Sequence, residues 1–228
     1  IQQVVVAHRG TDNLEGVLDD VNIFWDKKPK QYAVAKKFYE WLMSQLRQIS
    51  QADLEIYQVG DSLGAYIAEF LAIEQKQVVY SFESPGTGDA IERDLTSQGN
   101  ENLKEMRQNE DKWFHLFAAQ YNIINTCHRQ VSNVYHVPIK VILPGMFPAR
   151  IPKGYGEPFY LEYSVKAHVM NLKYMENALD SGKKGVKEAW PVGFKEGYQS
   201  FKKYDGYMKD FWDKYMKTLW SRDCFRGL

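Results

Sequence analysis

The chain has 228 residues, enough for one α/β domain with a substantial core and short for two. Its 29 Lys and Arg residues balance 29 Asp and Glu residues, so the charge gives no support to nucleic-acid binding. Two cysteines, Cys127 and Cys224, are too few for a disulfide-dependent scaffold, and no apolar run approaches transmembrane length. There is no signal-peptide pattern, and a start at Ile1 instead of methionine leads us to expect a processed or trimmed N-terminus.

The first predicted elements are a buried strand and a helix. Residues 4–7 form a β-branched run typical of a central parallel strand, and the polar, glycine-containing loop 8–13 ends it. Residues 36–48 have the spacing of an amphipathic helix. Its expected apolar face consists of Phe38, Trp41, Leu42, Leu46 and Ile49.

The most informative stretch is the next strand and turn. Residues 54–59 alternate apolar and polar side chains and lead into Gly60-Asp61-Ser62-Leu63-Gly64, after which small apolar residues recur at helical spacing. A strand, a tight turn and a helix with serine at the apex are typical of a nucleophile elbow. The two glycines have a steric reason, because side chains there would collide with the strand or the helix around a strained serine.

Further strands and helices are predicted along the chain. Residues 78–82 have a buried-strand pattern closed by the turn-rich segment 83–89, and residues 94–112 are polar enough for a solvent-facing helix or loop. Two further parallel strands are predicted at residues 121–125 and 137–143. A helix with His168, Leu172, Met175 and Leu179 on adjacent turns follows.

This alternation favours an α/β fold, with a mostly parallel sheet covered by helices on both faces. In such sheets functional residues gather at the carboxyl ends of the strands. The residues that fall at these ends are Gly10, Thr11, Ser62, Glu83 and Asn125.

The C-terminal part has a different composition, so we expect a domain over residues 1–185 and an aromatic-rich helical extension over 186–228. Tyr204, Tyr207, Phe211 and Tyr215 have helical spacing, with Trp212 and Leu219 widening the face. We expect this face to pack on the domain, because such stripes usually bury against their own protein. The alternative is contact with a membrane surface or a protein partner.

Three ordered motifs, at residues 5–11, 60–65 and 81–88, together resemble the class 3 (fungal-type) lipase family of α/β hydrolases, in its divergent branch. The resemblance covers roughly residues 4–180. It implies the α/β-hydrolase fold, an acyl ester or lipid substrate and no cofactor. Position by position it implies Ser62 as nucleophile, Leu63 and Thr11 as oxyanion-hole donors, and His168 as general base.

The chain departs from the family pattern at the acid. The usual aspartate would follow the 121–125 strand, but no carboxylate occurs between Asp111 and Glu157. Glu83, after the preceding strand, is the best substitute, since it could hold the His168 tautomer through the δ nitrogen. Asp89 and then Asp61 are the next candidates for the acid. A further alternative is that Asn133 or a backbone carbonyl orients the histidine. The chain also differs from the family at two other positions. Asp61 stands before the serine where the family usually has His, and His8 stands before the Arg-Gly pair where the family usually has Phe.

The residues thus predict a serine-dependent carboxylic ester hydrolase of the lipase or esterase class. The alternative is a catalytically impaired lipase-like domain that binds a partner or a lipid, because a fold alone does not establish activity. No metal-ligand spacing such as C-x-x-C or H-E-x-x-H is present, so no metal is implied. We interpret His8, His115, His128 and His136 as structural or surface residues.

Overall fold

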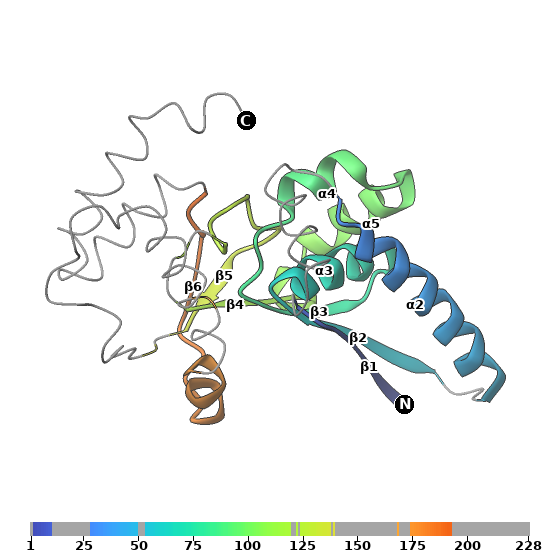
Figure 1. Ribbon diagram of the computed structural model, residues 1–228, viewed down its shortest axis with the longest axis horizontal. Helices are drawn as coiled ribbons and strands as arrows, with labels where there is room; N and C mark the ends of the chain where they lie inside the picture. Colours follow the sequence, from blue (N-terminus) through green and yellow to red (C-terminus); the bar gives the residue numbers. More distant parts are fainter. Residues whose placement is uncertain are drawn as a thin grey trace, which may run out of the picture.

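A computed structural model describes residues 2–10, 28–49, 53–119, 122, 124–137, 139, 168 and 174–192. Within these residues six strands form one sheet in the order β1-β2-β3-β4-β5-β6 (Figure 1). Neighbouring strands are parallel from β1 to β5, and β6 is antiparallel to β5. The strands are β1 Gln2–His8, β2 Leu54–Asp61, β3 Val78–Phe82, β4 Phe114–Ala118, β5 Val134–His136 and β6 Val186–Glu188. The predicted mostly parallel α/β sheet is confirmed.

Helices connect these strands. They are α2 Lys30–Ile49, α3 Leu63–Gln75, α4 Gly88–Asp94, α5 Ser97–Arg107 and α6 Glu110–Trp113. Residues 174–180 are also helical, and His168 has helical backbone geometry. None of the helices in the described part of the chain is long and apolar enough to cross a membrane.

Side-chain alternation along the strands divides the interior into two cores. On β3, Val79 and Ser81 point toward α3, while Tyr80 and Phe82 point to the opposite face. The larger core lies between the sheet and α2, α3 and α5. The smaller one lies against the helix at 174–180, which contributes Met175. Figure 1 shows α3 above the sheet and this helix below it, so helices lie on both faces.

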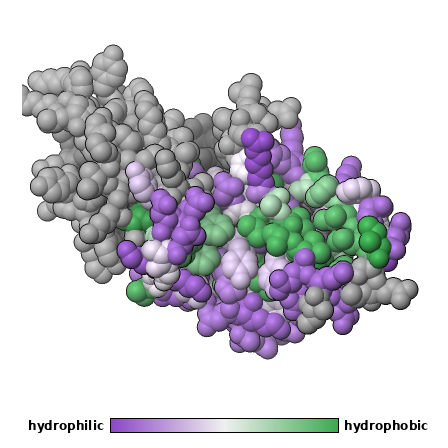
Figure 2. Space-filling view, turned by 90° about the horizontal axis from the view of Figure 1, so that it is seen from below, coloured by the Kyte–Doolittle hydropathy of each residue, from purple (hydrophilic) through white to green (hydrophobic). Residues whose placement is uncertain are grey.

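The lower face is less completely covered near β1, where Val5 is 63% exposed. Seen from below in Figure 2, hydrophobic residues gather in the middle of the described part, with hydrophilic residues around them. Aromatic rings stack in rows across strands on this face, Phe82 on Phe117 and Phe117 on Tyr135, each at 5.3 Å. These cross-strand pairs strengthen the middle of the sheet.

Helix α3 is the central helix of the fold. Every residue from Leu63 to Ile73 is buried, which explains why the helix is rich in small and apolar side chains. Its C-terminal end is closed by Asn102 of α5, whose amide donates to the carbonyls of Ile73 and Glu74 at 2.9 and 3.0 Å. The rigid position of α3 fixes the turn that precedes it.

The strand predicted at residues 121–125 is wrong. Strand β4 lies earlier, at Phe114–Ala118, and the described residues of 121–125 form a turn. The reason is local hydrogen bonding: the Asn122 side-chain oxygen accepts from the N–H groups of Ile124 and Asn125, both at 2.9 Å. Asparagine side chains of this kind stabilise turns in competition with a strand.

The expected apolar face of the first helix also needs correction. Phe38, Trp41 and Ile49 are exposed, at 50%, 57% and 82%. The buried face of α2 carries Tyr32 and Tyr39, and of the expected apolar residues Leu42 packs against the core beside them. A tyrosine ring packs well in a core when its hydroxyl finds a partner, as that of Tyr39 does in Gln77.

Three other expectations are refined. The polar stretch 94–112 is helical as predicted, but it is not wholly solvent-facing, since Leu103 and Met106 are buried. The strand expected at 137–143 is not found at its described residues, Val137 and Ile139, because β5 lies earlier, at Val134–His136, and residues 138 and 140–143 lie outside the described residues. The predicted extension begins with β6, which belongs to the same sheet, and its residues 193–228 lie outside the described residues.

Candidate active site

Ser62 occupies the turn between β2 and α3 with a positive φ, at φ 52° and ψ −122°. Its side chain is half-buried. The glycines around it have no room for a side chain: a Cβ on Gly60 would lie 2.2 Å from the Gly64 carbonyl oxygen, and one on Gly64 would lie 2.1 Å from that of His8. The steric reason predicted for both glycines is therefore confirmed.

Ser62 and Glu83 stand side by side at the carboxyl edge of the sheet. Asp61 and Phe82 are paired between β2 and β3, and Ser62 and Glu83 are the next residues of each strand. The backbone N–H of Ser62 donates to the Phe82 carbonyl at 2.9 Å, and that of Glu83 donates to the Phe117 carbonyl at 2.8 Å. Both residues therefore continue the strand ladder at one level of the edge.

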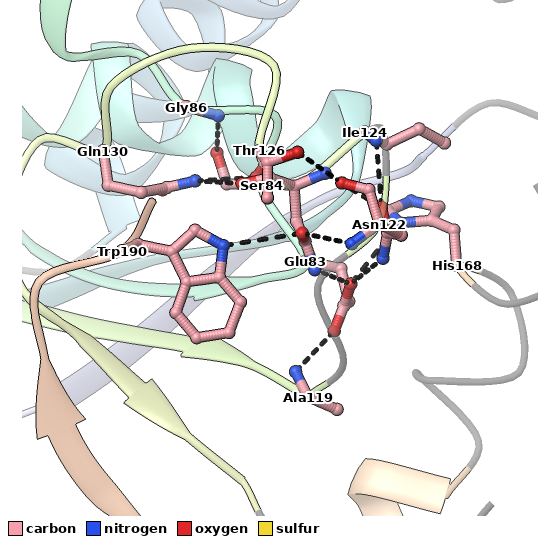
Figure 3. Close-up of polar contacts among 11 residues, drawn as sticks. Glu83, Ser84, Gly86, Ala119, Asn122, Ile124, Thr126, Gln130, His168 and Trp190 are labelled. Atoms are coloured by element: carbon pink, nitrogen blue, oxygen red, sulfur yellow. Dashed lines mark hydrogen bonds and ion pairs between the residues drawn. The ribbon is translucent and has the colours of Figure 1, made fainter. Parts of the chain in front are cut away.

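Glu83 also has a positive φ, of 52°, and is fully buried. Oε1 accepts from the Ala119 N–H at 2.7 Å, and Oε2 accepts from the side-chain amides of Asn122 at 3.0 Å and Asn125 at 2.8 Å (Figure 3). Three donors compensate for the loss of water around a buried carboxylate. The carboxylate is thus fixed in position.

His168 is the neighbour of this carboxylate. Its Nδ1 lies 3.5 Å from Glu83 Oε2, and the residue is buried (Figure 3). That distance is longer than a hydrogen bond. Among the described residues neither ring nitrogen of His168 makes a hydrogen bond. The arrangement leaves Nδ1 facing a carboxylate and Nε2 available to another group.

The other candidates for the acid do not lie beside His168. Asp89 is exposed and forms an ion pair with Arg129 at 2.8 Å. Asp61 lies against the first loop, since a Cβ on Gly10 would come within 2.6 Å of its Oδ2. Asn133 is exposed. Glu83 is the carboxylate that the structure brings to His168.

The predicted oxyanion-hole donors are described in part. Leu63 is the first residue of α3, so its N–H lies in the turn where helix N–H groups have no acceptor within the helix. The positive end of the helix dipole is at the same place. Thr11 lies outside the described residues, but the preceding loop packs on the elbow, because Gly64 contacts the His8 carbonyl and Gly10 contacts Asp61.

The sequence does not predict which residues donate hydrogen bonds to Glu83. The sequence places Asn125 at this edge of the sheet but does not predict that it or Asn122 binds Glu83, although the spacing Asn-x-x-Asn is a turn signal that points to such a loop. Trp190, which was grouped with the extension, is buried and donates from Nε1 to Asn125 Oδ1 at 3.4 Å. Gln130 ties the same loop to the segment after β3, with Nε2 donating to the Ser84 carbonyl at 2.9 Å.

A second buried carboxyl, Glu69, lies on α3 behind the elbow. It accepts from the hydroxyls of Ser81, at 2.5 Å, and Thr87. Burial raises its pKa above the ordinary value of 4.5, while the hydrogen bonds oppose that rise. Glu69 therefore joins α3 to Ser81 of β3, before Glu83 in the chain, and to Thr87 at the start of α4, after it.

A buried polar chain supports the end of β1. His8 Nε2 and Gln58 Oε1 are 2.7 Å apart, Gln58 Nε2 donates to Gln77 Oε1 at 2.7 Å, and Gln77 donates to the Tyr39 hydroxyl. Because Gln58 offers its oxygen, His8 carries a proton on Nε2. Burial lowers the pKa of His8 below its usual value. His8 is structural, as expected.

Among the described residues no group of three or more His, Cys, Asp or Glu side chains could hold a metal ion. Comparison of the chain with known proteins found no matching family model, no matching curated protein and no matching solved structure. The function is therefore inferred from the geometry of Ser62, Glu83 and His168.

Proposed function

We propose that this chain is a serine-dependent carboxylic ester hydrolase with the α/β-hydrolase fold, related to the class 3 lipase family and acting on acyl esters or lipids. The observation that carries the proposal is the Glu83 carboxylate, fixed by three donors and facing His168 Nδ1 at 3.5 Å. Next to it on the adjacent strand is Ser62, at the apex of a strained strand–turn–helix. Strain of this kind clusters at functional sites.

In the proposed reaction His168 Nε2 removes the proton of Ser62 Oγ as Oγ bonds to the ester carbonyl carbon. The Leu63 N–H stabilises the negative oxygen, with Thr11 as the second donor. The carbonyl re-forms, the C–O bond of the ester breaks and the alcohol leaves with the proton from His168. Water, deprotonated by His168, then releases the acid and restores Ser62.

Glu83 would hold His168 in the tautomer with the proton on Nδ1 and stabilise the imidazolium. The 3.5 Å separation in the free protein is compatible with this role, because catalytic hydrogen bonds are often long before substrate binds. We expect the contact to shorten when Nε2 receives a proton. These steps require no metal or cofactor.

The alternative is a lipase-like domain that binds a lipid or a partner without turnover. The observation in its favour is that His168 Nε2 has no hydrogen-bond partner among the described residues, Ser62 included. A histidine that never approached Ser62 would leave the serine inactive.

A fluorophosphonate probe distinguishes the two functions, because it labels only an activated serine. The hydrolase proposal predicts label on Ser62, located by mass spectrometry, and its loss in Ser62→Ala and His168→Ala. Ser97→Ala, at an exposed serine on α5, is the matched control and should label like the wild type. A folded wild type without label would favour the binding domain.

A further inference from the structure

Helix α2 has a second apolar stripe on its outer face. Val34, Phe38 and Trp41 are 69%, 50% and 57% exposed, although the opposite face of the same helix is buried through Tyr32 and Tyr39. The spacing i, i+4, i+7 places the three exposed residues on one line along the helix. The rings of Phe38 and Trp41 lie 5.8 Å apart and form one contiguous aromatic surface. In Figure 1 this helix lies at the outer side of the fold.

The stripe is bordered by positive charge. Lys30 and Lys37 are exposed and lie one turn before and one turn after Val34, and Lys37 is also one turn before Trp41. Glu40 is the only acidic residue in the sequence of α2, whereas the whole chain has no net charge. The outer face is therefore locally cationic.

A second copy of the chain would be a poor occupant. The three side chains expose on the order of 300 Å² of apolar surface, against roughly 800 Å² per partner in a stable interface. A symmetric dimer would also bring Lys37 of one copy near Lys37 of the other, because the same patch faces itself. Both considerations disfavour self-association through α2.

An anionic lipid surface fits the stripe better. Tryptophan and phenylalanine partition to the boundary between head groups and acyl chains, and lysines beside them meet lipid phosphates. We propose that the outer face of α2, centred on Val34, Phe38 and Trp41, docks the protein on membranes that contain anionic lipids. This docking lies outside the residues of the candidate active site and does not depend on hydrolysis.

The test is flotation of the full chain with vesicles of phosphatidylcholine, with and without phosphatidylglycerol. The proposal predicts binding to the anionic vesicles and a loss of about tenfold or more in partitioning for Phe38→Ser combined with Trp41→Ser. Both side chains are half or more exposed, so the melting temperature should change little. Val186→Ser, at a 71% exposed valine on β6, is the matched control and should bind like the wild type.

A charge variant gives a second readout that does not alter the apolar stripe. Lys37→Glu should reduce binding to anionic vesicles severalfold, while Lys104→Glu, at an exposed lysine of α5, should not. Equal binding of wild type and both α2 variants would overturn the proposal, as would a wild type that binds no vesicles. A dimer in size-exclusion chromatography that the double variant abolishes, without vesicle binding, would assign the stripe to a second copy instead. Hydrolysis of a soluble short-chain ester by these variants separates a failure here from a failure of the proposed activity.

Discussion

Ser62 and Glu83 both have a positive φ, and they directly follow two adjacent strands. Each has φ 52°, where a side chain other than glycine costs about 1 kcal/mol or more. Elsewhere among the described residues, Lys76 at the end of α3 is the only other non-glycine with positive φ. The fold therefore keeps a conformational cost at two neighbouring positions of one sheet edge, and the buried hydrogen bonds of Glu83 offset part of it.

Glu83→Gln should lower kcat for a soluble ester by about 10²- to 10⁴-fold with little change in KM. The amide replaces one acceptor oxygen by a donor that faces Ala119 N–H or the asparagine amides, and it removes the charge beside His168. Steady-state kinetics on the folded variant measure the effect. Asp89→Asn is the control, because Asp89 pairs with Arg129 at the surface, and a larger loss there than in Glu83→Gln would contradict the assignment of the acid.

Gly64→Ala should destabilise the protein by about 2–4 kcal/mol, because the added Cβ would lie 2.1 Å from the His8 carbonyl oxygen and the backbone would have to move. Urea unfolding measures the change. Gly99→Ala on α5 is the control: the one atom within 3.0 Å of its Cβ would be the end of the flexible Leu95 side chain, at 2.9 Å, and alanine favours a helix. Similar losses in both variants would mean that the close packing around the turn is not the cause.

At the level of elements, the strands and helices around the serine turn were predictable because their patterns are local. β1, β2, α3 and β3 follow from β-branched runs, glycine spacing and small helical residues. The same reasoning failed at residues 121–125, where hydrogen bonds of Asn122 outweigh the β propensity of the neighbouring isoleucines. It failed again on α2, since the pattern of apolar residues does not say which of two faces the sheet will cover.

The candidate site was predictable in part from the sequence. The approach of Glu83 to His168 followed from strand ends and the resemblance, because both depend on residue type and order. The groups that hold Glu83 did not, since Ala119, Asn122 and Asn125 meet it only after β4 and the following turn are correctly placed. Long-range partners of a buried charge depend on the tertiary fold.

Asn102→Ala should cost about 1–3 kcal/mol of folding stability. The Asn102 amide donates to the carbonyls of Ile73 and Glu74 at the end of α3, and without it both carbonyls lose this donor, although Ile73 keeps the bond from the Lys76 N–H. Asn100→Ala in the same helix is the control, because the Asn100 side chain is exposed and its contact to the Leu95 carbonyl is 3.5 Å long. Thermal or urea unfolding of both variants compares the two sites, and equal losses would contradict the capping role.

For the whole molecule, acidification should lower stability through His8. Burial holds the pKa of folded His8 below its usual 6.5, so the unfolded chain takes up a proton at a higher pH than the folded chain. The contribution of neutral His8 is complete above pH 6.5 and falls as the pH drops from there toward the folded pKa. Glu69 acts in the opposite sense: its raised pKa means that its charged form disfavours folding as the pH rises above 4.5.

Comparison with His8→Gln isolates the histidine, because Glu69 is common to both proteins. The variant should be less stable than the wild type near neutral pH, and its deficit should shrink on acidification by at most about 1.4 kcal/mol per pH unit. Urea unfolding at about pH 7.5 and about pH 5.5 measures this difference. A deficit that is the same at both pH values would show that His8 does not titrate differently in the two states.

The order of the strands also bears on how the protein is made. Each described strand pairs with the strand that precedes it in the sequence, so the sheet can grow one strand at a time as the chain leaves the ribosome. His168 follows Glu83 by 85 residues, which corresponds to about 4–17 s of synthesis at ~5–20 residues per second. During that interval the sheet edge with Ser62 and Glu83 can assemble without His168. If the proposed hydrolase function holds, the nascent protein would stay inactive during this interval, because Ser62 needs His168 to remove its proton.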